Sequence, residues 1–175
     1  MKTDGLRPLF DENAIRQRIA ELARQIDACY GEEPVTMICV LKGACIFFSD
    51  LIRHLECRPV LDFVALSSYE NRTCSGDGVI LDKDAASELR DKHVLVVEDI
   101  VDTGRSMSWL LDHLRAFQPR SLRLAVLIDK YERREMAIEA DFYGFRVTDG
   151  FIVGYGLDYA EQYRELPALY ALPPE

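Results

Sequence analysis

Apolar and polar positions near the N-terminus alternate with the period of an amphipathic helix. Apolar residues recur there every three or four positions: Ile15, Ile19, Leu22 and Ile26. This spacing places them on one face and predicts a helix within 10–31. Asp11 or Asn13 can cap the start of this helix, and Gly31 can end it.

Short apolar runs and helical patterns alternate through the middle of the chain. The apolar runs predict buried strands at 35–41, 59–66, 78–81, 93–100 and 121–129. Helical patterns occupy 44–55 and 106–117. Residues 131–175 carry short strand patterns and no long helix. Strands that alternate with helices form right-handed βαβ units, so we predict an α/β fold whose mostly parallel twisted sheet is flanked by helices.

The composition limits the class of protein. The chain has 175 residues without an internal repeat or linker, which fits one domain that buries roughly 70% of its unfolded surface. A net charge of −9 argues against a general nucleic-acid surface, which needs a basic face. No secretory signal or membrane-spanning run is visible, and the five cysteines form no CxxC pair. We expect a cytoplasmic protein with no nucleic-acid or membrane partner.

A candidate phosphate site follows the apolar run at 94–97. The loop there leads into the predicted helix at 106–117 and consists of Asp102, Thr103, Gly104, Arg105 and Ser106. The first amides of a helix have no internal partners, so these amides, the helix dipole and the hydroxyl groups can hold a phosphate. Gly104 lets the backbone approach the anion closely. The loop matches neither GxxxxGK[ST] nor GxGxxG.

Three acidic residues lie in this loop or just before it, namely Glu98, Asp99 and Asp102. Carboxylates would repel a bound phosphate unless a divalent metal or a positively charged transition state compensates them. Glycosyl transfer provides such a cation at the sugar, and neighbouring carboxylates stabilise it. A sugar phosphate with a magnesium-bound leaving group therefore satisfies the whole motif, and Mg²⁺ is the expected cofactor. A solvated acidic turn is the plain alternative.

The stretch "VLVVEDIVDTGRSM", residues 94–107, resembles the phosphoribosyl-pyrophosphate signature of the type I phosphoribosyltransferases. That signature is a hydrophobic run, two acids, two apolar residues and Asp-Thr-Gly. Taken alone, "VLVVED" also resembles the first strand of a response-regulator receiver domain. A receiver domain needs a longer chain after this strand than the one present here, which argues against it.

Four further segments resemble the hypoxanthine phosphoribosyltransferases, in the same order and spacing. They are "LKGACIFFSDL", "VALSSY", "LIDKYERRE" and "FYGFRVTDGFIVGYGLDYAEQYRELP". The resemblance implies one domain with its core at about 30–130 and a small hood from the N-terminal segment and 131–175. It implies Mg²⁺-dependent transfer of the phosphoribosyl group from phosphoribosyl pyrophosphate to hypoxanthine or guanine, giving IMP or GMP and pyrophosphate. It also implies a homodimer or homotetramer.

The same resemblance assigns roles to individual residues. Those expected to bind the phosphoribosyl group are Glu98, Asp99, Asp102, Thr103, Gly104, Arg105 and Ser106. Those expected to bind pyrophosphate are Lys42, Gly43, Ser68, Tyr69 and Arg164, with Ser68-Tyr69 opening a loop that closes over the site. In the family a non-proline cis peptide usually precedes the lysine at the position of Lys42.

The purine pocket and the chemistry are assigned in the same way. Lys130 is expected to donate to the 6-oxo group, Phe151 to stack on the base and the Ile152 backbone to face its edge. Residues expected to bind the metal are Glu98, Asp99 and Asp158, the last also beside the base. Asp102 is the expected general base toward the N7 proton. "KYERRE" has Tyr-Glu where relatives often have Pro-Ser, and the loop "NRTCSG" has no clear counterpart.

Three alternative functions stay open from the sequence. Xanthine-guanine specificity uses the same signature with a differently built base pocket. An RNA-binding regulatory relative would need a basic face and a steep salt dependence of binding. A non-catalytic receiver domain would accept a phosphoryl group from acetyl phosphate.

Overall fold

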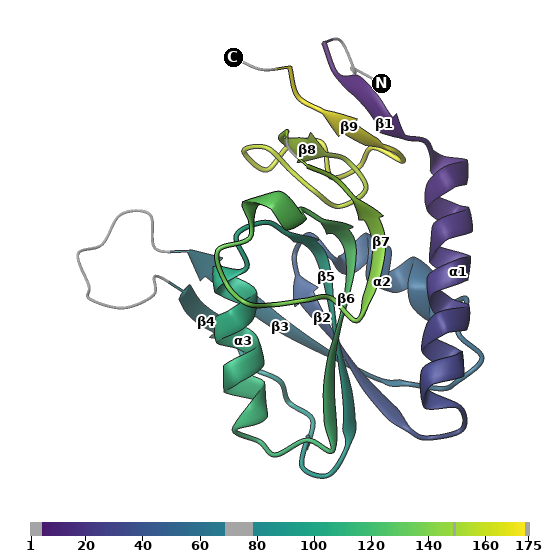
Figure 1. Ribbon diagram of the computed structural model, residues 1–175, viewed down its shortest axis with the longest axis vertical. Coiled ribbons are helices and arrows are strands. Elements are labelled where there is room, and N and C mark those ends of the chain that lie inside the picture. The colour runs from purple at the N-terminus through teal and green to yellow at the C-terminus, as the bar shows by residue number, and fades with distance from the viewer. Residues whose placement is uncertain (1–4, 69–78, 149, 174–175) are drawn as a thin grey trace.

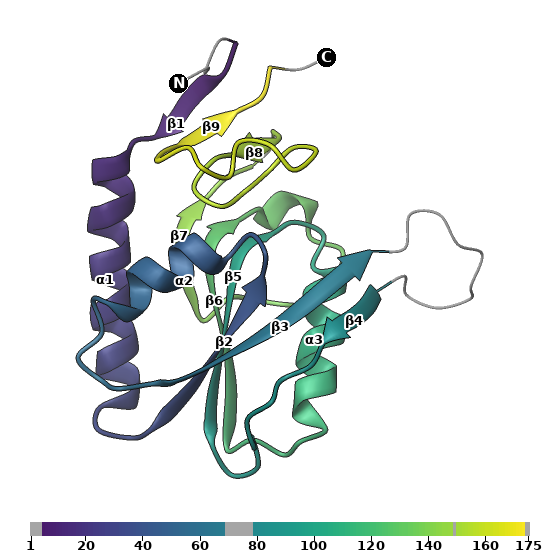
Figure 2. The same ribbon diagram turned by 180° about the vertical axis from the view of Figure 1, so that it is seen from behind.

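The computed structural model describes residues 5–68, 79–148 and 150–173, which form two sheets and the helices around them (Figures 1 and 2). The larger sheet runs in the order β4 (Val79–Lys83), β3 (Val60–Ser68), β2 (Val35–Leu41), β5 (His93–Val101), β6 (Ser121–Asp129) and β7 (Phe142–Arg146). All its neighbouring strands are parallel except β3 and β4. The predicted α/β class with a mostly parallel sheet is confirmed.

Among the described residues three α-helices flank this sheet, and a side-chain cap fixes the start of the first. They are α1 (Glu12–Tyr30), α2 (Cys45–Ile52) and α3 (Arg105–Arg115). Asp11 caps α1, because its carboxylate accepts the amide of Ala14 at 2.8 Å. Gly31 ends α1 with a φ of 56°, and its amide donates to the carbonyl of Asp27. Asp11 therefore fills the capping role for which Asn13 was the other candidate.

The two faces of the sheet carry separate hydrophobic clusters. Leu95 and Val97 of β5 pack with the apolar residues of α1 and α2. Val94 and Val96 of the same strand pack with those of α3 on the opposite face. Side chains alternate between faces along a strand, so a run of apolar residues marks a strand that is covered on both sides. Figures 1 and 2 show α1 and α2 on one face and α3 on the other.

A small sheet brings the two ends of the chain together. It consists of β1 (Arg7–Phe10), β9 (Leu169–Ala171) and β8 (Ile152–Val153), all antiparallel. Figure 1 places it beyond the carboxyl ends of β2, β5 and β6, where the candidate site residues emerge. β1 was not predicted, because four residues are too few to show a period. None of the helices in the described part of the chain has the length and apolar composition that crossing a membrane requires.

The predicted boundaries lie within two residues of the observed ones, with one exception. The strands at 35–41 and 121–129 have the predicted limits. The helix predicted over 44–55 ends at Ile52, because Arg53 is its C-cap and the chain turns after it. This part of the prediction was wrong: Leu55 is a partly buried apolar residue that packs on the core from outside the helix.

Candidate active site

Four segments meet beyond the carboxyl ends of the central strands. They are the Lys42-Gly43 turn after β2, the segment from Glu98 to Ser106 that runs from the last residues of β5 into the first turn of α3, Lys130 after β6, and 154–166 of the C-terminal segment. Ligands of parallel α/β sheets bind at this edge. The structure thus brings most of the predicted site residues to one place.

The start of α3 has the features of an anion site. Gly104 adopts a left-handed conformation with φ 84° as the N-cap, and no side chain of the described residues caps the helix there. A Cβ atom at this position would lie 2.9 Å from Cδ of Arg134, so the loop needs glycine for space as well as for conformation. Apart from the Arg105 amide, which lies 3.5 Å from Oγ1 of Thr103, the first amides of α3 are therefore available to a ligand.

Glu98 and Asp99 form a pair of adjoining carboxylates at the end of β5. Oε1 of Glu98 accepts the amide of Asp99 at 3.0 Å, and Oδ1 of Asp99 accepts that of Ile100 at 2.8 Å. Burial raises the pKa of Glu98 well above its ordinary value, and the neighbouring charge of Asp99 adds to this increase. A cation placed between them would relieve this repulsion.

The Lys42-Gly43 turn packs tightly between two other parts of the site. The Leu41–Lys42 peptide bond is cis, as the resemblance implies. A Cβ atom on Gly43 would lie 1.8 Å from Oδ2 of Asp99, and one on Gly156 would lie 2.1 Å from the Gly43 carbonyl oxygen. Close approach requires glycine at both positions, and at Gly156 a φ of 103° requires it as well.

Asp102 and Lys130 lie in contact, although 28 residues separate them in the sequence. Oδ2 of Asp102 is 3.2 Å from Nζ of Lys130 and 3.2 Å from a guanidinium nitrogen of Arg133. Lys130 is only 3% exposed, and its amide donates to the carbonyl of Val101. Oδ1 of Asp102 is buried and has no hydrogen-bond partner among the described residues. Rotation of the carboxylate would present this oxygen to a ligand as a hydrogen-bond acceptor.

Asp158 and Arg164 face each other in the C-terminal segment. Their side chains form an ion pair at 2.7 Å, and Arg164 also donates to the carbonyl of Gly156 at 2.7 Å. Glu161 lies 3.0 Å from Nζ of Lys42 and 3.5 Å from Arg164. One carboxylate therefore bridges two cations that are expected to bind pyrophosphate.

Phe151 and Ile152 take different environments at the start of β8. Phe151 is 50% exposed and meets the ring of Tyr159 edge-on at 5.3 Å between centroids. Ile152 is buried. Ser68 is the last residue of β3, whereas Tyr69 and the expected closing loop lie outside the described residues.

The comparison with known families now decides the class of protein. The model of the phosphoribosyl transferase domain matches residues 7–160. The chain belongs to the phosphoribosyltransferase family. The resemblance seen in the sequence is confirmed, and the receiver-domain alternative is wrong.

Relatives within the phosphoribosyltransferase family cover the whole chain. The hypoxanthine-guanine phosphoribosyltransferase of Bacillus subtilis is 40% identical over 99% of this chain and 97% of its own length. The bifunctional protein TilS/HprT of Listeria innocua is 41% identical over 100% of this chain, which spans only 27% of that protein. The crystal structure of a hypoxanthine phosphoribosyltransferase from Staphylococcus aureus superimposes with a TM-score of 0.92 at 37% identity, covering 98% of this chain and 94% of that one.

A magnesium ion fits the donors of this phosphoribosyltransferase site. No group of three or more His, Cys, Asp or Glu residues close enough to hold a metal occurs in the described part of the chain. Mg²⁺ commonly takes only one or two protein carboxylates and completes its shell with substrate phosphates and water. Glu98 and Asp99 supply two such carboxylates, and a diphosphate would supply further oxygens.

Among the residues that contact this site but were not predicted are Arg133 and Glu161. Arg133 approaches Asp102, and Glu161 approaches Lys42. Both lie in segments that resemble the hypoxanthine phosphoribosyltransferases, but the resemblance assigned them no role. A further sequence signal for Glu161 is its position three residues from both Asp158 and Arg164.

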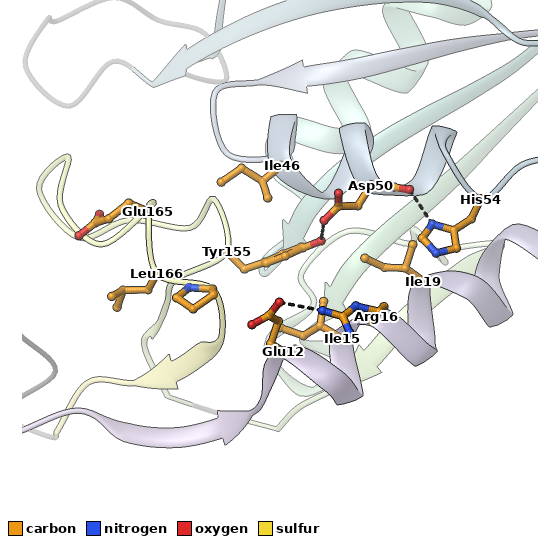
Figure 3. A pocket seen from close by; sticks show the side chains of 11 residues that line it. Glu12, Ile15, Arg16, Ile19, Ile46, Asp50, His54, Tyr155, Glu165 and Leu166 are labelled. Atoms are coloured by element: carbon orange, nitrogen blue, oxygen red, sulfur yellow. Dashed lines mark hydrogen bonds and ion pairs between the residues drawn. The ribbon is translucent and has the colours of Figure 1, made fainter. Parts of the chain in front are cut away.

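A separate cavity of about 370 Å³ lies between α1, α2 and the C-terminal segment (Figure 3). On its wall the hydroxyl of Tyr155 donates to the carboxylate of Asp50 in α2. Burial raises the pKa of this hydroxyl, and the carboxylate adds to the effect. This contact ties α2, which starts just after Lys42-Gly43, to the segment that carries Asp158 and Arg164.

Replacing Tyr155 by Phe should lower the free energy of unfolding by about 1.5 kcal/mol. The substitution removes a hydrogen bond to a carboxylate. The expected loss of stability lies at the lower end of the range for such bonds, because the Asp50 carboxylate can still bind solvent and Arg53. Urea unfolding followed by circular dichroism measures the change. Tyr131→Phe, at an exposed tyrosine, is the control and should leave the unfolding curve in place. Equal effects of the two variants would contradict the role of this contact.

Proposed function

We propose that the protein is a purine-salvage enzyme that transfers the phosphoribosyl group of phosphoribosyl pyrophosphate to hypoxanthine and to guanine. The products are IMP or GMP and pyrophosphate. The contact between Asp102 and Lys130 beside the uncapped start of α3 carries this proposal. It joins a carboxylate, an ammonium group and a phosphate-binding helix end within one site.

The Asp102–Lys130 pair is complementary to one edge of a 6-oxopurine. N7 and O6 are neighbours on that edge, so a carboxylate can accept the N7 proton while an ammonium group donates to O6. Asp102 acts as the general base in this arrangement. The exposed ring of Phe151 stacks on the base, and the backbone of Ile152 faces its other edge. Adenine presents an amino group to Lys130, which is a donor facing a donor.

The phosphoribosyl group lies along the loop between β5 and α3. Backbone amides and hydroxyls of Asp102, Thr103, Gly104, Arg105 and Ser106 bind its 5′-phosphate. Glu98 and Asp99 hold the ribose hydroxyls, directly or through the metal, and their charge favours the oxocarbenium-like transition state. Glu98 and Asp99 together, and Asp158 apart from them, would be the protein contacts of Mg²⁺, which when bound would neutralise the diphosphate leaving group.

Pyrophosphate leaves through the cationic side of the site. Lys42, Gly43 and Arg164 bind it, together with Tyr69 and with Ser68, the last residue of β3. Arg164 must exchange its ion pairs with Asp158 and Glu161 for the diphosphate. Closure over the site excludes water, which would otherwise attack the sugar cation.

The proposal extends to the organisation of the protein. The core at about 30–130 supplies the phosphoribosyl site, and a hood built from the N-terminal segment and 131–175 supplies the base pocket. The working form is a cytoplasmic homodimer or homotetramer that binds neither nucleic acid nor membranes. Gel filtration with light scattering tests the assembly.

A panel of four bases tests the activity directly. The purified protein, Mg²⁺ and phosphoribosyl pyrophosphate are incubated with hypoxanthine, guanine, xanthine or adenine, and nucleotide formation is followed by chromatography. We expect IMP and GMP, with adenine slower by about 10³-fold or more, because the site is built around an acceptor at position 6. Product from xanthine and guanine but not from hypoxanthine would favour the xanthine-guanine alternative. No nucleotide from any base would contradict the proposal.

A further inference from the structure

The segment after β6 forms a strap against the phosphate loop, where strap means residues 131–138. The amides of Glu135 and Met136 both donate to the carbonyl of Thr103, at 2.9 and 3.2 Å. Arg105 at the start of α3 forms an ion pair with Glu135 at 2.6 Å. The strap thus contacts the loop through its backbone as well as through side chains.

The central side chain of this strap is Arg134, which is only 12% exposed. Its Nε donates to the carbonyl of Asp102 at 3.2 Å, and Nη2 donates to that of Val101 at 3.4 Å. Nη1 donates to the carbonyl of Ile138 at 2.8 Å. Nη2 also forms an ion pair with the buried carboxylate of Asp129. All three nitrogens of the guanidinium group are therefore bound to protein, which leaves it poorly placed to bind a substrate anion itself.

The peptide geometry gives these contacts a direction. In a trans peptide the C=O and the following N–H point to opposite sides, and the only cis bond described lies at Leu41–Lys42. The carbonyls of Val101, Asp102 and Thr103 all point toward the strap. The amides of Asp102, Thr103 and Gly104 must therefore point away from it.

We propose that Arg134 is a positioning residue that orients the amides of the phosphate loop for the 5′-phosphate of the substrate. Asp129 holds the guanidinium group, the guanidinium group holds two consecutive carbonyls, and the opposed amides form the anion site. This inference rests on the proposed function, because it takes the loop to be the 5′-phosphate site. It adds a residue that does not touch the substrate.

Arg146 provides a matched control in the same charge cluster. Its Nε lies 3.2 Å from the other oxygen of Asp129, and its guanidinium group stacks on Tyr143 at 4.3 Å. It is 53% exposed, and the contacts described for it do not include the phosphate loop. Arg146→Met therefore removes a partner of Asp129 without releasing the loop.

The test compares ligands that carry the 5′-phosphate with ligands that lack it. Calorimetry measures the Kd of IMP, of inosine and of magnesium pyrophosphate for the wild type, Arg134→Met, Arg134→Lys and Arg146→Met. We expect Arg134→Met to weaken IMP binding by about 10–100-fold, as for loss of a rigidly aligned site, with the Kd values of inosine and pyrophosphate within about twofold of wild type. Arg146→Met should leave all three unchanged.

Arg134→Lys keeps the charge beside Asp129 but not the planar fork that reaches two carbonyls. It should fold as the wild type does and still lose IMP affinity selectively, so it decides the question if Arg134→Met does not fold. Equal weakening of all three ligands, or unchanged IMP binding in Arg134→Lys, would overturn the proposal. Failure of the wild type to form nucleotide in the base panel would instead contradict the proposed function, a result that the binding data do not depend on.

Discussion

Replacing Asp102 by Asn should lower kcat for IMP formation by about 10²–10⁴-fold, which is the usual contribution of general base catalysis. The amide keeps an oxygen for Lys130 and Arg133, which now contact Oδ2 of the carboxylate. It cannot accept the N7 proton of the base. The loss should appear in kcat measured with saturating phosphoribosyl pyrophosphate and hypoxanthine, while the KM values change less.

The control for this substitution is Asp112→Asn, which removes an exposed carboxylate from α3, the helix that follows the loop of Asp102. It should leave kcat unchanged. Thermal unfolding of both variants separates a catalytic loss from a loss of folded protein, which matters because Asp102 is the counter-ion of the buried Lys130. If folded Asp102→Asn retained kcat within twofold of the wild type, Asp102 would not be the base.

The sequence could predict only part of the contact between Asp102 and Lys130. The strands predicted at 93–100 and 121–129 end in the structure at Val101 and Asp129, which are partners in the parallel register of β5 and β6. The residue after each strand must then emerge beside the other. The sequence identified both strands from their long apolar runs, but it did not show that they are neighbours in the sheet. Only the order of the strands in the folded sheet shows that β5 and β6 are neighbours.

The supporting contacts of the site could not be predicted in the same way. β1, β8 and β9 are two to four residues long, and such short strands carry no usable period. Arg134 looks like any exposed arginine in "KYERRE", and its burial depends on how the strap folds back on the loop. The motif residues could be identified from the sequence because such a cluster of acidic residues beside a predicted phosphate loop is unusual. The residues that orient them are of common types, so the sequence did not distinguish them from surface residues.

Substitution of Gly43 should have the second large effect on activity, for a steric rather than an electrostatic reason. A methyl group at this position would lie 1.8 Å from Oδ2 and 2.6 Å from Cγ of Asp99, so the carboxylate must move. Asp99 is proposed to hold the metal and the ribose, and displacing such a group by about 1 Å costs roughly 100-fold in rate. Gly43→Ala should therefore lower kcat/KM for phosphoribosyl pyrophosphate by about that factor, measured at saturating Mg²⁺ and hypoxanthine.

A double-mutant cycle distinguishes this explanation from a general distortion of the turn. Asp99→Ala removes the atoms that the new methyl group would strike, so Gly43→Ala should cost much less activity in the Asp99→Ala background than in the wild type. Residues that act through one contact are non-additive in this way, whereas independent sites add. If the two losses of transition-state stabilisation simply added, the methyl group would be acting on the turn itself. The close packing of Gly43 against Asp99 would then not be what the site requires of this glycine.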